Sequence, residues 1–270
     1  MTDNNQFNEL LGKIKEKNST RTITIWIPSL KKGVDFKHLT LNQQKTLIKS
    51  SVRENLLKLD FSRNMFDIIK QNISDNTVKV NQLTTIDLIS IGLSYRAVDI
   101  SDDYGFYVGE EYYPVDLNKI CQSVRTTDYG DVFEQDTIVA DGFHVKVSVP
   151  TIRVDKIMND HLFEKYKDTP DDPETLRDIL ADVYIHEAAK YIMSVHMVSE
   201  GDNPDEPPVE VPMGGMTAPQ RLQVIDQIPL TVLNKLVTIS DKVQAIESNL
   251  LDIPVGDDVA TITLNSAFFT

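Results

Sequence analysis

Apolar and polar residues alternate along residues 22–27, and this period of two predicts a β-strand with one buried face. The isoleucines of the segment would lie on that face, and its threonines on the other. A second extended run, residues 34–39, follows Gly33, whose freedom to adopt a positive φ suits a short bulged hairpin. The pattern therefore predicts an antiparallel strand pair near the start of the chain.

The period then becomes helical. Thr40 and Gln43 have the spacing of a capping box, and the apolar stripe that begins at Leu41 predicts a helix of about five turns. Two further helices are predicted over residues 65–73 and 86–97, where apolar residues recur at helical intervals. The stripe of the first helix consists of Leu41, Ile48, Val52, Leu56 and Leu59.

The middle of the chain favours strands, because residues 112–124 and 137–154 are rich in apolar and β-branched side chains and are broken by glycines. Further on, Asp172 before Pro173 is typical of a helix N-cap with proline at the first position. The apolar stripe that follows predicts one long helix reaching Val195. Its members are Leu176, Leu180, Tyr184, Ala188, Tyr191 and Val195.

Residues 199–216 combine acidic residues, prolines and glycines with almost no core-forming side chains, which is typical of a linker. We therefore expect an α+β protein in three parts. Residues 1–198 would form a mixed core domain, residues 199–216 an acidic linker, and residues 217–270 a helical segment with a strand-like tail.

Beyond the linker, an a/d heptad seam runs from Val232 to Leu250, and the chain ends in two adjacent phenylalanines. The seam covers less than three heptads, so it could pack within its own domain or face another chain. An apolar terminal segment often docks into a groove, in the same chain or in a neighbour. The residues that we predict to bind a partner are Leu236, Ile239, Val243, Ile246, Phe268 and Phe269.

Composition excludes a disordered chain, since 41% of the 270 residues are hydrophobic. The 41 acidic residues outnumber the 27 Lys and Arg, and the net charge of -14 would repel a phosphate backbone. Cys121 is the only cysteine, which is typical of a reducing compartment. Because no segment has the length and apolarity of a membrane span, we expect a cytosolic protein that binds neither membrane nor nucleic acid.

No catalytic residue, metal ligand or cofactor site is predicted. The segment that begins at His186 resembles a zincin helix, but Lys190 stands where the second histidine of H-E-x-x-H would be. Ser94 lies in a near match to the nucleophile elbow that lacks its last glycine. Acidic pairs occur in several loops, and none matches an EF-hand.

The opening segments, from about Ile23 to Ile120, resemble the baseplate hub assembly proteins of T-even-type contractile-tailed bacteriophages. The strand pair is followed by "hLTLNQQKTLIKSS", FDIIKQNI, LTTIDLISIGLSYRA and VDLNKI. The family pattern includes a Lys-containing helix, a "kLT-x-x-D" helix start, an "L-x-x-R" and a terminal phenylalanine pair. The matching residues are Lys45, Leu47, Ile48, Leu83, Thr84, Asp87, Leu93, Arg96, Phe268 and Phe269.

The resemblance implies a viral structural or assembly protein that is made in the host bacterial cytoplasm and acts on the hub of the tail baseplate. It would bind other hub proteins or the tape-measure protein, without chemistry and without a cofactor. Its oligomeric state and its presence in the finished virion tail are left open. One alternative is a tape-measure chaperone that is absent from the mature particle, and a less favoured one is a metal-dependent enzyme.

Overall fold

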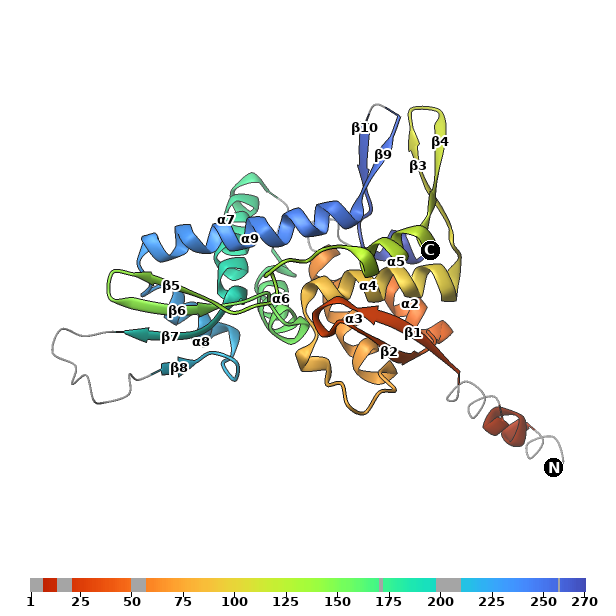
Figure 1. The fold of residues 1–270 in the computed structure, drawn as a ribbon, viewed down its shortest axis with the longest axis horizontal. Helices are drawn as coiled ribbons and strands as arrows, with labels where there is room; N and C mark the ends of the chain where they lie inside the picture. Colours follow the sequence, from red (N-terminus) through yellow and green to blue (C-terminus); the bar gives the residue numbers. More distant parts are fainter. Residues whose placement is uncertain (1–6, 14–20, 50–56, 170–171, 198–209, 257) are drawn as a thin grey trace.

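The computed structural model describes residues 7–13, 21–49, 57–169, 172–197, 210–256 and 258–270 (Figure 1). Helices and small antiparallel sheets alternate along the chain, so the predicted α+β class is confirmed.

The predicted strand pair is present. β1 (Thr22–Ile27) and β2 (Lys32–Lys37) are antiparallel, and Ile25 lies opposite Val34. The positive φ of their connection falls on Lys31 instead of Gly33. At Gly33 the backbone lies close to the Thr24 side chain on the paired strand, and an added Cβ would be only 2.8 Å from that side chain.

Helices pack over this strand pair. The predicted capping box is formed, with the Gln43 side chain accepting from the Thr40 amide at 2.9 Å. The single five-turn helix stays a prediction, since the structure describes helix up to Lys49 and again from Leu57, and residues 50–56 lie outside the described residues. Val52 and Leu56 of the predicted stripe lie outside the described residues. The helices are α2 (Leu41–Lys49), α3 (Leu57–Asn72), the short η3 (Val80–Gln82), α4 (Thr85–Tyr95) and the π-helical turn η4 (Arg96–Ile100).

The two strand regions predicted for the middle of the chain extend beyond the observed strands, because each becomes helical at its C-terminal end. Residues 112–124 are a strand only as far as Asp116, whose side chain accepts from the Lys119 amide and begins a helix. Residues 137–154 likewise turn helical at Ile152, with Thr151 as the N-cap. The elements are β3 (Asp103–Val108), β4 (Glu111–Asp116), α5 (Leu117–Thr126), β5 (Asp136–Ala140), β6 (Phe143–Val147) and α6 (Ile152–Tyr166).

The long helix α7 (Pro173–Tyr191) begins where predicted, and Asp172 accepts from the amides of the first turn. It ends four residues before Val195, because β7 (Ile192–Met197) pairs with β6 in a four-stranded antiparallel sheet of order β5-β6-β7-β8. The fourth strand, β8 (Glu210–Pro212), lies inside the predicted linker. The linker prediction is therefore wrong for residues 210–212, and residues 199–209 lie outside the described part.

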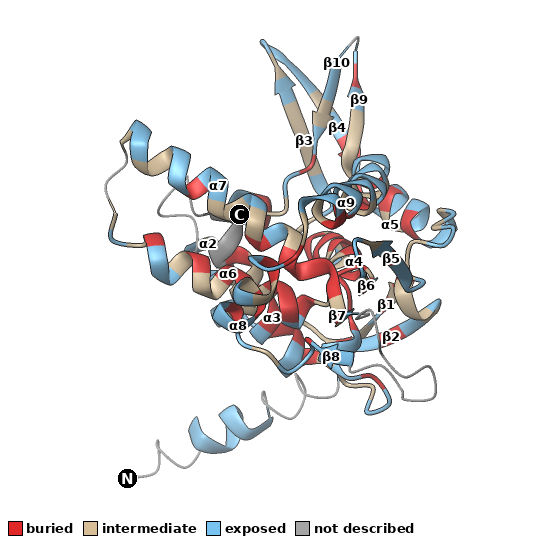
Figure 2. Ribbon diagram, turned by 90° about the vertical axis from the view of Figure 1, so that its left-hand side faces the viewer, coloured by how far each residue is buried: buried red, intermediate tan, exposed pale blue. Residues whose placement is uncertain are grey.

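Two apolar cores share the helix α9 (Leu230–Leu251), which runs across the molecule in Figure 1. Val232, Leu236 and Val243 belong to the core under the four-stranded sheet, together with residues of α6 and α8 (Ala218–Ile225). Leu250 belongs to the core beneath the strand pair. Figure 2 shows the buried residues gathered at the centre of the molecule.

The chain end folds back over the first core through the hairpin β9 (Asp252–Val255) and β10 (Asp258–Thr261) and the short helix η5 (Ser266–Phe269). Ile262, Phe268 and Phe269 are buried there. Residues 217–270 therefore supply parts of both cores and do not form a separate segment behind a linker.

A substitution of the last phenylalanine tests this packing. Phe269 is fully buried and its ring lies 5.5 Å from that of Phe61. We expect Phe269→Ala to lower the free energy of unfolding by about 3–5 kcal/mol, because it opens a cavity in the core. Chemical denaturation measures this, with Val259→Ala on the exposed face of β10 as the control. Equal midpoints for the two variants would contradict the placement.

Candidate functional site

The six residues predicted to bind a partner pack against other residues of the same chain. The core residues Leu236, Val243, Phe268 and Phe269 are almost fully buried, and Ile239 and Ile246 are half-buried in the same seam. Of the two alternatives that the heptad pattern left open, this structure has packing within the chain. The apolar surface that this structure exposes therefore lies elsewhere.

One exposed apolar surface lies on two hairpins. β3–β4 and β9–β10 stand side by side and project from the body in both views (Figures 1 and 2). They meet where Gly256, in the β9–β10 turn, approaches Tyr113: a Cβ at this glycine would lie 3.0 Å from the tyrosine hydroxyl oxygen. At the base, the Tyr104 ring contacts that of Phe268 at 5.1 Å. Phe268 thus supports the β3–β4 hairpin from inside.

The outer part of this hairpin pair carries aromatic side chains in solvent. The Tyr107 and Tyr112 rings lie 5.0 Å apart on paired strands, and the Tyr107 side chain is 75% exposed. Val259 on β10 is also exposed. Tyrosine combines a large apolar ring with a polar hydroxyl, which is why it is enriched in protein interfaces.

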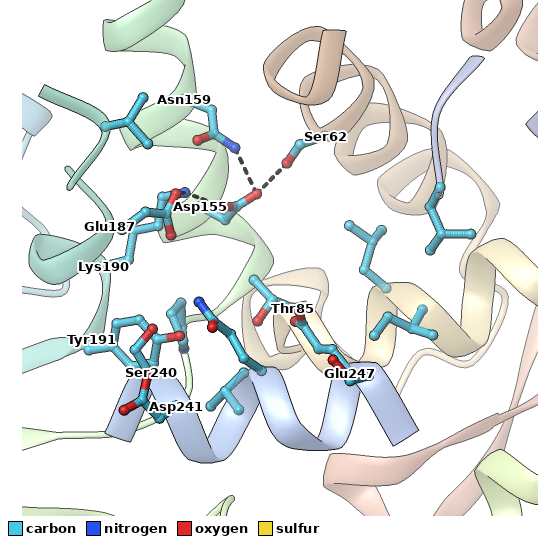
Figure 3. Close-up of a pocket in the computed structure, with 18 of the residues that line it drawn as sticks. Ser62, Thr85, Asp155, Asn159, Glu187, Lys190, Tyr191, Ser240, Asp241 and Glu247 are labelled. Carbon is cyan, nitrogen blue, oxygen red and sulfur yellow. Dashed lines mark hydrogen bonds and ion pairs between the residues drawn. The ribbon is translucent and has the colours of Figure 1, made fainter. Parts of the chain in front are cut away.

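A second feature is an open cleft of about 820 Å³ between α7 and α9, closed at its base by residues of α3, α4 and α6 (Figure 3). Its α7 wall contains Leu180 and Tyr184, which are 68% and 51% exposed. Both belong to the apolar stripe predicted for the long helix. Ala188 and Tyr191 of the same stripe also line the cleft, and Tyr191 is buried in the core beside it.

A buried ion pair forms the base of the cleft. The Lys190 ammonium lies 2.8 Å from an Asp155 oxygen and also pairs with Glu187, and the lysine side chain is almost fully buried. The other oxygen of the Asp155 carboxylate accepts hydrogen bonds from Ser62 and from Asn159, the latter at 3.0 Å. Figure 3 shows these side chains converging from α3, α6 and α7.

Electrostatics in the cleft favours a stable, charged lysine. Burial alone would lower the pKa of Lys190, but the nearby carboxylates of Asp155 and Glu187 outweigh it and raise the pKa. Burial raises the pKa of Tyr191 to about 12, although a hydrogen bond with Ser240 opposes the shift. A lysine held as an ammonium and a tyrosine held neutral are structural groups here, since neither is poised to exchange a proton near neutral pH.

A histidine pair joins α6 to α7 nearby. His186 Nδ1 lies 2.6 Å from the Asp182 carbonyl oxygen, which only accepts, so Nδ1 carries the proton. His186 Nε2 then accepts from His161 Nδ1 at 3.0 Å. Burial lowers the pKa of His186, and the neighbouring His161 acts in the same direction. A neutral His186 fits both contacts, because its Nδ1 donates and its Nε2 accepts.

The residues of the near matches to catalytic motifs have other neighbours in the structure. Lys190 belongs to the ion pair described above, and Ser94 Oγ has a contact of 3.9 Å with Cys121 Sγ. His196 lies opposite His144 in the sheet. In the described ranges, no group of three or more His, Cys, Asp or Glu residues could hold a metal ion, and no helix is long and apolar enough to span a membrane.

Comparison with family models, with curated proteins and with solved structures gave no match for this chain.

Sequence reasoning missed the buried charges. Arg221 is almost fully buried and donates to the carbonyl oxygens of Ala189 at 3.0 Å, Ile192 at 3.2 Å and Met213 at 2.8 Å. It thereby satisfies acceptors where α7 gives way to β7. In the sequence, Glu187 and Lys190 show only the i,i+3 spacing of a surface pair. Nothing local indicates that Asp155 completes the site.

The ion pair leads to a stability prediction. We expect Lys190→Met to cost about 3–5 kcal/mol of unfolding free energy, because Asp155 remains buried without its cation. The matched control is Lys146→Met, which removes a half-exposed pair with Glu210 and should cost at most about 1 kcal/mol. Denaturant midpoints measure both. Similar losses for the two variants would show that Lys190 is not held as described.

The histidine pair leads to a pH prediction. Because the pKa of His186 is lowered in the folded state, its contribution to stability is complete above the unfolded pKa of about 6.5 and is lost as the pH falls below it. We expect the wild type to lose more stability than His186→Gln between about pH 7.5 and about pH 5.5. Unfolding curves at both pH values measure the difference, and parallel losses would contradict it.

Proposed function

We propose that this protein is a subunit or assembly factor of the tail baseplate hub of a contractile-tailed bacteriophage, and that it acts by binding other proteins. The proposal starts from the sequence resemblance over about residues 23–120. It takes its physical support from the projecting hairpin pair.

The residues that carry the resemblance mainly hold the fold. Thr84 and Asp87 form the capping box of α4, and the Asp87 carboxylate also accepts from the Ser29 amide at 2.9 Å. It thereby ties the β1–β2 connection to the helix. Arg96 donates to backbone carbonyls, including that of Asp103 at 3.1 Å. A pattern of this kind points to a shared scaffold, and the binding function must come from the surface.

The observation that carries the proposal is the exposed aromatic pair on the hairpins. An isolated two-stranded ribbon is marginally stable in water, because it has almost no apolar surface to bury. Here the two ribbons approach each other at Gly256 and Tyr113, while Tyr107 and Tyr112 are exposed to solvent. A protein partner that covered these rings would bury apolar area and pair with the open strand edges.

The proposed partners are other hub proteins or the tape-measure protein, and the site of assembly is the host cytoplasm. Mass spectrometry of purified virions decides between a hub subunit, which remains in the particle, and a tape-measure chaperone, which leaves it. Elemental analysis of the purified protein tests the metal-dependent enzyme, the least favoured function.

Tyrosine substitutions test the binding surface. We expect the double variant Tyr107→Ser and Tyr112→Ser to bind co-expressed hub or tape-measure proteins at least about tenfold more weakly, because it removes the aromatic anchors. Its thermal stability should remain close to that of the wild type, since both rings are solvent-exposed. Val139→Ser, at an exposed position of β5, is the matched control. Wild-type affinity of the double variant would refute the role of the hairpins.

A further inference from the structure

The outer end of the β3–β4 hairpin combines two exposed rings with two carboxylates. Tyr107 and Tyr112 are paired across the hairpin and therefore share one face, with 75% and 43% of their surface exposed. Glu110 and Glu111 lie between them in the sequence, at the turn, and both are exposed. Two aromatic rings and two negative charges are thus gathered within six residues at a projecting end of the molecule (Figures 1 and 2).

Neither projecting hairpin carries a cation. Residues 103–116 contain four acidic residues and residues 252–261 contain three, while both segments lack Lys and Arg. Together they hold half of the net charge of -14, and six of the seven acidic residues lie in the described part of the chain. The negative charge of the protein is therefore concentrated on the hairpin pair.

Arg96 lies at the base of the β3–β4 hairpin, away from the outer carboxylates. It donates to the backbone carbonyl oxygens of Ser101 and Asp103. Asp103 is the first residue of β3, and Glu111 is paired with the last, five residues further on. At about 3.4 Å per residue, the Glu111 backbone lies about 17 Å from the base. Arg96 therefore compensates negative charge at the base and leaves the outer end anionic.

Carboxylates of both hairpins act at the same place. The Tyr113 hydroxyl donates to Glu111 at 2.9 Å. The pKa of Tyr113 is raised, mainly by this hydrogen bond, and the charges of Glu111 and Asp258 act in the same direction. Asp258 belongs to β10, so the second hairpin adds its negative potential to that of the first.

Exposed rings beside carboxylates match the chemistry of arginine. The guanidinium group is planar, stacks on aromatic rings and pairs with carboxylates, whereas the lysine ammonium is a compact and strongly hydrated charge. The body of the protein contains this arrangement: Arg63 lies over the Phe163 ring, 4.7 Å from its centroid, and its Nε is 2.5 Å from an Asp160 oxygen. The hairpins offer the rings and the carboxylates without the arginine.

The charge of the whole chain favours a different protein as the source of the arginine. A second copy would bring a further net charge of -14, and the long-range repulsion between the two copies opposes their approach. A cationic segment of another protein is attracted to the hairpins over the same distances. Charge complementarity therefore selects such a segment.

We propose that the hairpin pair binds a segment of a different protein through arginine side chains. A guanidinium group lies against the Tyr107 and Tyr112 rings and pairs with the carboxylates of Glu110 and Glu111. This inference rests on the proposed function for the role of the hairpins as a binding surface, and it adds the chemistry that the partner must present.

Two labelled peptides test this chemistry. One alternates glycine with arginine, and the other has lysine at every arginine position, so both carry the same charge. Fluorescence anisotropy with the purified full chain should show saturable binding of the arginine peptide. The lysine peptide should bind about threefold or more weakly, because the guanidinium stacks better on the rings. Absence of binding, or equal affinities of the two peptides, would overturn the proposal.

Variants of the rings provide a matched comparison. Tyr107→Ser together with Tyr112→Ser should remove the preference for arginine over lysine. Tyr107→Phe together with Tyr112→Phe should keep it, because phenylalanine retains the aromatic face. A preference that the Ser variant retains, or that the Phe variant loses, would contradict stacking on these rings.

Variants of the carboxylates test the ion pairs. Glu110→Gln together with Glu111→Gln should weaken binding of the arginine peptide by about tenfold or more. The matched control, Glu174→Gln with Asp178→Asn, removes two exposed carboxylates from α7 and should leave the affinity nearly unchanged. Equal losses in the two double variants would place the peptide elsewhere on the anionic surface and would refute the contact.

Co-expression with hub and tape-measure proteins separates this inference from the proposed function. Recovery that depends on the tyrosines but not on Glu110 and Glu111 would keep the hairpins as a binding surface and overturn the arginine contact. Binding of the arginine peptide as expected, without recovery of these proteins, would support the contact and count against the hub function. Self-association that is abolished by Glu110→Gln with Glu111→Gln would make a second copy the occupant and overturn the choice of a different protein.

Discussion

The burial of the apolar seam of α9 is the constraint on which the rest of the structure depends. One end of the helix completes the core beneath the four-stranded sheet, and the other end, through Leu250, completes the core beneath the strand pair. Because α9 is a single continuous helix, the two cores cannot move independently without exposing part of the seam. The position of the chain end follows, since the β9–β10 hairpin after α9 returns Ile262 and the terminal phenylalanines to the first core.

Buried charges then determine how the other elements meet. Asp87 ties the β1–β2 connection to α4, Asp155 and Lys190 join α6 to α7, and Arg221 satisfies carbonyl groups at the junction of α7 and β7. A buried charge is costly unless its partners are in place, so each of these groups tolerates few alternative arrangements. Burial of the apolar seam stabilises the fold but is not directional. The hydrogen bonds and ion pairs determine how the helices and strands are oriented against one another.

The same packing decides where apolar surface is left uncovered. The seam of α9 and the last phenylalanines are buried, which leaves the aromatic pair on the hairpins, the walls of the α7–α9 cleft and the face of the N-terminal helix in solvent. These three surfaces differ in chemistry. The hairpins offer strand edges and tyrosines, the cleft combines exposed Leu180 and Tyr184 with a buried ion pair, and the N-terminal helix exposes Phe7, Leu10 and Leu11.

The sequence alone determined those elements that depend only on residues close together along the chain. The alternation of β1, the capping box at Thr40 and the N-cap at Asp172 are decided by residues within one turn or one strand, and each is present in the structure. The α+β class and the long helix α9 follow from periodicity in the same way.

Only the tertiary structure decided which apolar stripes are covered. Residues 192–197 form a strand, although they continue the helical stripe of α7, because they pair with β6. Leu180 is exposed although it has the helical spacing of a core residue, and Phe269 is buried although it lies next to the end of the sequence. Periodicity shows which side chains share a face of a helix or strand. Whether that face is buried depends on the elements that pack against it, and these lie far away in the sequence.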